Sequence, residues 1–439
     1  MTPRTTHTVH WAAWPLAIAS FCAIAADSAN AAEKNPAELP VTGKAVAGME
    51  SYDRMMTGLL REYKIAGGAL AVVRKGRLVL ARGYGWADVE QQQKVQPESL
   101  FRIASISKPI TSVTVLRLVE QGKLRLDARA FDLLPHIKPP AGAKVDPRIR
   151  RITLRQLLHH TGGWDRGKSY DAMFIPIKAA KALGAPAPAD HRTVIRYMLG
   201  QPLDFDPGAR YAYSNLGYAI LGRVIEQVTG KPYDEAVREL TLRPAGIKRM
   251  RLGRTLAKFR AKGEVRYYHH TPEQLADTVF LYTKPKVPWP YGGFNTEAMD
   301  AHGGWIASPI DLVRFASAID GARGKALLTT KSVSTMLSHP APPVAKGDSH
   351  HYGLGWLVRP VKQPVKVLLI GKEANWWHSG SLPGTATLLV RAHNGMIWAV
   401  TLNLRPKDAA YRTDLDKGLW KALREVKKWP EHDLFGKFD

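Results

Sequence analysis

A serine and a lysine stand three positions apart at the start of an apolar stretch that spans residues 101–124. Beyond them, apolar residues recur at the spacing of one helix face, and Gly122 ends the run. The pattern predicts a helix with Ser105 at its N-terminus and Lys108 one turn further along, on the same face.

This placement suits nucleophilic chemistry. A serine hydroxyl is a poor nucleophile unless a nearby base takes its proton. The positive end of a helix and burial both disfavour an ammonium ion, so Lys108 is expected to be partly neutral and basic. In the alternative, Ser105 is only a helix cap and Lys108 is a solvated first-turn residue. The pair alone does not decide, because about one such spacing arises by chance in a chain of this length.

A second segment carries Tyr213 and Asn215, just before the helical pattern of residues 216–228. Tyr213 is expected to share a proton with Ser105 and Lys108, as base in acylation and as acid toward the leaving group. Asn215 is expected to hold the lysine ammonium or a substrate amide oxygen. The alternative is a buried tyrosine next to an asparagine helix cap.

A third segment reads HSGS at residues 378–381, inside a strand-like run and before a turn. A strand edge there presents the Ser381 amide as one oxyanion-hole donor, with the Ser105 amide as the other. We therefore expect His378, Gly380 and Ser381 to bind the substrate or its oxyanion. The alternative for His378 is a packed or solvent-facing strand histidine.

The composition is that of a soluble globular protein, with 45% apolar and 23% charged residues among 439. Lysine and arginine number 63 against 38 acidic residues, which gives a formal charge of +25. A field of this sign favours nucleic acid, anionic membranes or anionic wall polymers.

The N-terminus helps to choose among these partners. Residues 1–31 follow the order of a secretory signal peptide: Arg4, an apolar run at 11–26, and an A-x-A site that ends at Ala31. A retained membrane anchor is the alternative. Cleavage after Ala31 predicts a periplasmic or secreted protein with no transmembrane segment in the mature chain. Such a protein rarely meets nucleic acid, so the charge favours anionic envelope polymers as partners.

Metal and disulfide chemistry are not expected. The only cysteine, Cys22, lies inside the signal segment, so the mature chain has none. The histidine pairs lack the spacing of known zinc helices.

In the mature chain, the sequence predicts a linker at residues 32–45 and one domain at residues 46–430. This domain has strand-like segments near both of its ends. Strands at both ends with helices between them predict one sheet completed by both parts of the chain. The expected elements are a helix at 47–63, a hairpin at 69–81, loops at 179–190 and 284–293, strands at 365–370, 376–379, 385–390 and 397–404, and a closing helix at 415–426.

The motifs SISK (105–108), YSN (213–215) and HSG (378–380), in that order and at wide spacing, resemble those of the serine β-lactamase and penicillin-binding-protein superfamily. The Tyr-x-Asn form resembles the branch of class C β-lactamases, DD-peptidases, D-aminopeptidases and esterases. Other segments of the sequence also resemble this branch, at residues 152–163, 205–230, 302–315 and 352–356.

The resemblance implies an α/β (α+β) fold of the β-lactamase/transpeptidase type, with an antiparallel sheet flanked by helices and an inserted, mostly helical domain. The sheet subdomain would comprise residues 46–103 and 300–430, and the helical subdomain residues 104–299. The resemblance also implies an acyl-enzyme on Ser105, formed with Lys108 and Tyr213 without a cofactor or metal.

One position departs from the β-lactamase pattern, which has a lysine where His378 stands. Lysine supplies a permanent cation for a substrate carboxylate, whereas histidine is mostly neutral near pH 7. We therefore expect an exported serine hydrolase of an ester or a D-amino-acid amide or peptide. A class C-like β-lactamase or a DD-carboxypeptidase is one alternative. A non-enzymatic envelope-binding protein on the same fold is another.

Overall fold

The computed structural model describes residues 39–344, 349–361 and 374–438. The predicted signal peptide and the strand expected at 365–370 lie outside these residues. The described residues belong to one compact unit, which begins at Leu39.

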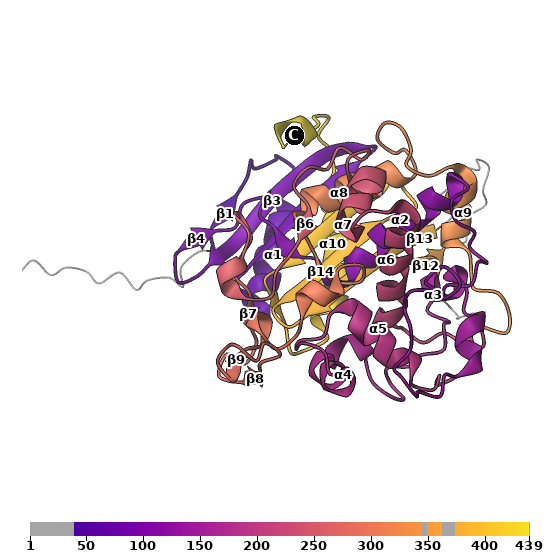
Figure 1. Cartoon of the computed structure of the whole chain (residues 1–439). Coiled ribbons are helices and arrows are strands. Elements are labelled where there is room, and N and C mark those ends of the chain that lie inside the picture. The colour runs from indigo at the N-terminus through magenta and orange to yellow at the C-terminus, as the bar shows by residue number, and fades with distance from the viewer. Residues whose placement is uncertain (1–38, 345–348, 362–373, 439) are drawn as a thin grey trace, which may run out of the picture. The chain divides into compact units, whose positions relative to one another are not determined.

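One large antiparallel sheet organises the fold. Within the described ranges, nine strands form it in the order β1-β3-β2-β15-β14-β13-β12-β11, with β4 paired to β3 (Figure 1). The strand β15 joins β2 at the centre, so both ends of the chain build one sheet, as predicted. The strands are β1 (Val41–Thr42), β2 (Gly67–Arg74), β3 (Arg77–Asp88), β4 (Gln93–Lys94), β11 (His351–Tyr352), β12 (Leu357–Pro360), β13 (Ala374–Leu382), β14 (Thr385–Arg391) and β15 (Met396–Leu402).

Short strands pair outside this sheet. The expected loop at 284–293 is partly wrong, because residues 286–288 pair with residues 275–277 in a small hairpin. The strand predicted at 397–404 forms two strands, β15 and β16 (Leu404–Arg405). The second of them pairs with β7 (Tyr268–His269) outside the large sheet. These strands are β5 (Phe101–Arg102), β6 (Arg251–Leu252) and β10 (Trp305–Ala307) in one group, β7 (Tyr268–His269) with β16 (Leu404–Arg405), and β8 (Leu275–Asp277) with β9 (Lys286–Pro288).

Helices cover both faces of the large sheet. Alternate side chains of the central strands point to opposite faces, so Leu70 and Val400 pack with α1 and α10, whereas Ala71 and Ala399 pack on the other side. The helices are α1 (Glu50–Glu62), α2 (Ser107–Glu120), α3 (Leu154–Leu158), α4 (Pro176–Leu183), α5 (His191–Leu199), α6 (Asn215–Thr229), α7 (Tyr233–Val237), α8 (Pro309–Ile319), α9 (Thr330–Leu337) and α10 (Tyr411–Glu425).

One sequence-based loop is wrong at its start. Residues 179–183 of the expected loop belong to α4, which Pro176 opens at its first position. Gly184 then ends the helix in the left-handed conformation, with φ of 58°. Alanine is a good helix former, and two alanines of α4, Ala179 and Ala180, are buried in the core.

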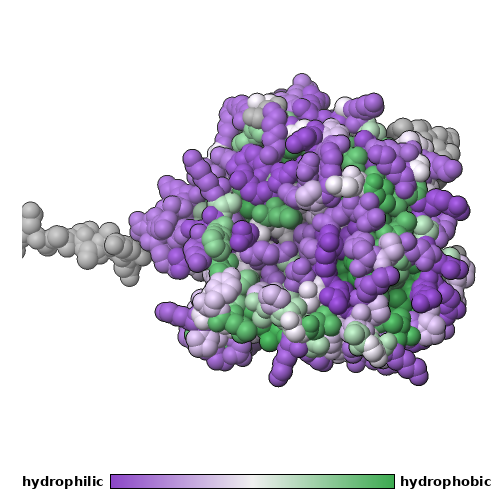
Figure 2. All heavy atoms as spheres, viewed as in Figure 1, coloured by the Kyte–Doolittle hydropathy of each residue, from purple (hydrophilic) through white to green (hydrophobic). Residues whose placement is uncertain are grey.

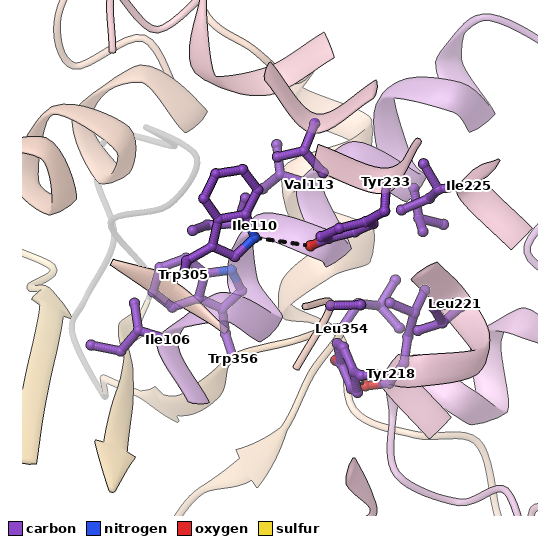
Figure 3. Close-up of a cluster of buried hydrophobic side chains, with 14 of the residues drawn as sticks. Ile106, Ile110, Val113, Tyr218, Leu221, Ile225, Tyr233, Trp305, Leu354 and Trp356 are labelled. Carbon is purple, nitrogen blue, oxygen red and sulfur yellow. Dashed lines mark hydrogen bonds between the residues drawn. The ribbon is translucent and has the colours of Figure 1, made fainter. Parts of the chain in front are cut away.

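The helix α2 is buried on nearly all sides. Figure 3 shows its Ile110 and Val113 among side chains of α6, with Trp305 and Tyr233 beside them. The indole nitrogen of Trp305 donates a hydrogen bond of 3.3 Å to the Tyr233 hydroxyl. Such an environment holds α2 rigidly, together with the segment that leads into it.

Within the described part of the chain, no helix combines the length and the apolar character that crossing a membrane requires. The boundaries of the two predicted subdomains stay a prediction.

Candidate active site

Ser105 lies in a tight turn of three residues that precedes α2. The residue before it, Ala104, has φ of 48°, in the left-handed region that residues with a side chain rarely adopt. The turn leaves Ser105 partly exposed, while its neighbours Ala104 and Ile106 are buried. No side chain caps the start of α2, so the alternative of Ser105 as a mere helix cap is wrong.

Lys108 is fully buried, at 0% exposure, so the alternative of a solvated lysine is also wrong. Its ammonium nitrogen donates to three acceptors: Asn215 Oδ1 at 2.7 Å, the His302 carbonyl at 2.9 Å and Ser105 Oγ at 3.3 Å. Burial holds the pKa of Lys108 well below its usual value, and the Asp171 carboxylate opposes this shift. An amine of this kind loses its proton readily.

Tyr213 lies over the same lysine. The ammonium nitrogen is 4.7 Å from the centre of the Tyr213 ring, and the Arg166 guanidinium is 4.6 Å from it. Burial raises the pKa of the Tyr213 hydroxyl, and its hydrogen bond with Ser105 opposes the rise. The phenol is therefore protonated at neutral pH and close to the Ser105 hydroxyl.

Asp171, which the sequence did not single out, completes a chain of polar contacts to Lys108. The amide nitrogen of Asn215 donates to Asp171 Oδ2 at 2.6 Å, while its oxygen faces the lysine. Arg166 lies 3.8 Å from the same carboxylate. The carboxylate thus fixes which end of the amide faces Lys108, because only the NH₂ group can donate to it.

The strand pair β13–β14 holds the segment before Ser105 through hydrogen bonds and one close backbone contact. Thr387 Oγ1 donates to the Ile103 carbonyl at 3.0 Å, and Thr385 Oγ1 donates to the Arg102 carbonyl at 2.8 Å. Gly380 lies so close that an added Cβ would be 2.1 Å from the Ile103 carbonyl oxygen. The third motif is therefore brought next to the first.

The His378 side chain is buried, with 3% exposure. Its Nδ1–H donates to the Ser379 carbonyl at 2.7 Å, and its Nε2 accepts from the Tyr352 hydroxyl at 2.9 Å, which assigns the neutral tautomer. Burial lowers its pKa to about 3, and the Lys108 charge acts in the same direction. His378 is thus neutral near pH 7.

A second buried histidine, His160, supports the tyrosine. Its ring centre is 4.2 Å from that of Tyr213 and 4.5 Å from that of Tyr352. Its Nδ1 accepts from the Ser214 backbone N–H at 3.1 Å. His160 has φ of 59°, so the loop holds it in an unusual conformation. His160 lies in the segment 152–163, which resembles the family, but the sequence alone predicts no role for it.

A cavity of about 350 Å³ opens onto Ser105. Asn215 and Ser381 line it, together with Phe174, whereas the predicted residue His378 does not. No residue of the segment 284–293, which was expected from the sequence to be a loop, lines it. Three arginines contribute to its walls, and they come from separate parts of the chain: Arg166, Arg405 and Arg412.

A family model described as Beta-lactamase matches residues 52–419, which contain all of these segments. The chain belongs to the beta-lactamase family.

Relatives in this family carry several names. The chain is 34% identical over 207 residues to Esterase EstB of Burkholderia gladioli, covering 45% of this chain and 49% of the esterase. It is 31% identical over 281 residues to Penicillin-binding protein 4 of Amycolatopsis lactamdurans, covering 61% of each. The matches thus span less than two thirds of these relatives.

Solved structures share the fold of this chain. A D-amino acid amidase from Ochrobactrum anthropi SV3 has a TM-score of 0.64 at 22% identity, covering 86% of this chain and 99% of the amidase. A penicillin-binding protein homologue from Pyrococcus abyssi has a TM-score of 0.62 at 22% identity, covering 88% of this chain and 80% of the homologue. These likenesses confirm the predicted mixed fold, with an antiparallel sheet flanked by helices.

Proposed function

We propose that the chain is an exported serine hydrolase that forms an acyl-enzyme on Ser105. The observation that carries the proposal is the contact between a partly exposed Ser105 and a fully buried Lys108, at 3.3 Å, on the wall of a cavity. A buried lysine that gives up its proton is a suitable base for a serine hydroxyl.

In acylation, Lys108 acts as a neutral amine. An amine has two N–H groups, and the two shorter contacts, to Asn215 Oδ1 and the His302 carbonyl, use both. Its lone pair then faces Ser105 Oγ and takes the hydroxyl proton while the oxygen attacks the substrate carbonyl. The backbone N–H groups of Ser105 and Ser381 stabilise the negative oxygen that forms.

Tyr213 transfers the proton onward. Its hydroxyl passes a proton to the leaving oxygen or nitrogen and regains one from Lys108, which restores the neutral amine. A water molecule then attacks the acyl-enzyme, and its proton returns to Ser105. The raised pKa of Tyr213 keeps it protonated and ready to donate.

The substrate class rests on the relatives and on His378. One relative is named an esterase, and a structure with the same fold is a D-amino acid amidase. His378 is neutral and hydrogen-bonded to Tyr352, so it does not supply the cation of the β-lactamase lysine. We therefore favour an ester or a D-amino-acid amide or peptide over a β-lactam.

Labelling with a fluorophosphonate, followed by mass spectrometry, tests the nucleophile. We expect one adduct, on Ser105, that is lost in Ser105→Ala and kept in the matched surface variant Ser334→Ala. Failure to label would favour a non-enzymatic envelope-binding protein. Turnover of p-nitrophenyl esters, D-amino-acid anilides and a chromogenic cephalosporin then separates an esterase or amidase from a β-lactamase.

Export and envelope contact belong to the same proposal. The signal at 1–31 directs cleavage after Ala31, and the charge of +25 suits anionic envelope polymers and not nucleic acid. Figure 2 shows hydrophilic side chains over much of one face of the protein. Secreted material whose first residue is Met1 would contradict cleavage after Ala31, and a protein confined to the cytoplasm would contradict export.

A further inference from the structure

The cavity beside Ser105 has a cationic end that the catalytic residues do not need. Arg405 lies in β16 and Arg412 lies in the first turn of α10, and both line the cavity together with Ser381. Neither residue belongs to the three motifs. Both lie after β15, in the segment of the chain that forms β16 and the start of α10.

These two arginines have no acidic partner in the part of the chain that the structure describes. Among the described residues, no carboxylate lies within ion-pair distance of either guanidinium, whereas Arg166, the third arginine of the cavity wall, lies 3.8 Å from Asp171. Arg412 donates only to the Tyr411 hydroxyl, at 3.3 Å. The Arg405 side chain makes no hydrogen bond in the described structure, although it is only partly exposed.

The placement of Arg405 is electrostatically unfavourable without a ligand, whereas Arg412 is exposed to solvent. Burial lowers the pKa of Arg405, the Tyr411 hydroxyl opposes this shift, and the neighbouring Arg412 charge adds to it. Arg412 also stands in the first turn of a helix, where the helix dipole disfavours a cation. Two like charges kept together in this way make a site for an anion, because a guanidinium pairs with a carboxylate through two parallel hydrogen bonds.

We infer that Arg405 and Arg412 bind a carboxylate carried by the substrate, at the end of the cavity next to Ser381. The inference rests on the proposed acyl-enzyme at Ser105 and adds the charge of its substrate. A cation that His378 does not provide is thus supplied by β16 and α10. The preferred substrates are esters or D-amino-acid peptides with a free carboxylate close to the bond that is cut.

Matched pairs of substrates test the charge. On the acyl side, p-nitrophenyl hydrogen adipate is compared with p-nitrophenyl hexanoate, which has the same carbon count without the carboxylate. On the leaving-group side, an acyl-D-alanyl-D-alanine with a free C-terminus is compared with its C-terminal amide. We expect wild type to prefer the anionic member of at least one pair by tenfold or more in kcat/KM, mainly through KM.

Substitutions locate the preference. In the double variant Arg405→Gln/Arg412→Gln, the ratio of anionic to neutral kcat/KM should fall at least tenfold, and Arg405→Lys should keep part of it. The matched control is Arg424→Gln, an exposed arginine of the same helix, which should keep the wild-type ratio.

Two outcomes would overturn the inference: no preference for the anionic member in either pair, or a preference that the double variant retains. Failure of the proposed function has a different signature. In that case neither member of a pair is hydrolysed, and the fluorophosphonate does not label Ser105. Normal turnover of neutral substrates without a charge preference would leave the hydrolase intact and remove the carboxylate site alone.

Discussion

The amide of Asn215 donates a hydrogen bond of 2.6 Å to the carboxylate of Asp171, and this contact sets the surroundings of the catalytic lysine. Because the NH₂ group faces Asp171, the amide oxygen faces Lys108 at 2.7 Å. Asp171 thus acts through Asn215 as a positioning residue. It also places a negative charge near a lysine that is otherwise surrounded by Arg166 and neutral histidines.

Asp171→Asn should shift the pH profile of kcat/KM. The carboxylate raises the pKa of Lys108, so its removal lowers this pKa and favours the neutral amine. If neutral Lys108 is the base, the acid limb moves to lower pH, while the plateau falls because the Asn215 amide is free to turn over. Asp165→Asn changes the same charge on the same loop but pairs with Arg210, so it should leave the acid limb in place. A lower plateau with an unmoved limb would make Asp171 a structural residue only.

Ser105→Ala should abolish acyl-enzyme formation and turnover. Lys108→Ala and Tyr213→Phe should each lower kcat by several orders of magnitude, and the losses should not add, because the three groups act as one unit. Kinetics of the single and double variants on one p-nitrophenyl ester measure this directly. Additive losses in the Lys108→Ala/Tyr213→Phe pair would show that the two residues act independently.

Periodicity and motif order predicted much of the fold and the centre of the site. Hydrophobic spacing indicated α2 and α6, and continuous β-type runs indicated β14 and β15, whose residues are buried throughout. The contact between Ser105 and Lys108 was predictable because one helical turn separates them. Tyr213 and Gly380 needed the motif resemblance, since they lie more than a hundred residues away.

The remaining site residues follow from tertiary packing. Asp171 lies between elements, and Arg405 and Arg412 lie at the ends of elements, so nothing local marks them as neighbours of Ser105. His378 lies on the more buried face of β13, with Trp376 and Gly380, but tryptophans at both 376 and 377 do not indicate from the sequence which face that is. The segment 179–190 is rich in alanine and proline, so its sequence did not reveal that residues 179–183 belong to a helix.

Gly380→Ala should impair catalysis strongly. A Cβ at this position would be 2.1 Å from the Ile103 carbonyl oxygen and 2.2 Å from Thr387 Oγ1, so the backbone before Ser105 has to move. A displacement of about 1 Å at a nucleophile costs on the order of a hundredfold in rate. The control Gly58→Ala lies in α1 with nothing within 4 Å of the new Cβ. It should keep full activity and stabilise the fold by about 0.5–1 kcal/mol. A wild-type kcat in Gly380→Ala would show that the contact does not position Ser105.

Buried histidines should make the fold sensitive to mild acid. Burial lowers the pKa of His159 to about 4 and that of His378 to about 3, and the pKa values of His160 and His302 also lie well below their usual value. The unfolded chain binds a proton at each histidine near pH 6.5, whereas the folded protein does not. Stability is therefore complete above pH 6.5 and falls as the pH drops toward the folded pKa values.

His159→Asn measures the share of one such group. The asparagine amide keeps a donor for the Tyr352 carbonyl, which His159 Nδ1 contacts at 3.0 Å. Below pH 6, the loss of unfolding free energy should be shallower than in wild type by up to about 1.4 kcal/mol per pH unit, the value for one proton. Urea unfolding between pH 7 and 5 gives this slope, and the exposed His136→Asn is the control. An identical slope in wild type and His159→Asn would mean that His159 is protonated in the folded protein, because only then does unfolding bind no proton at this position.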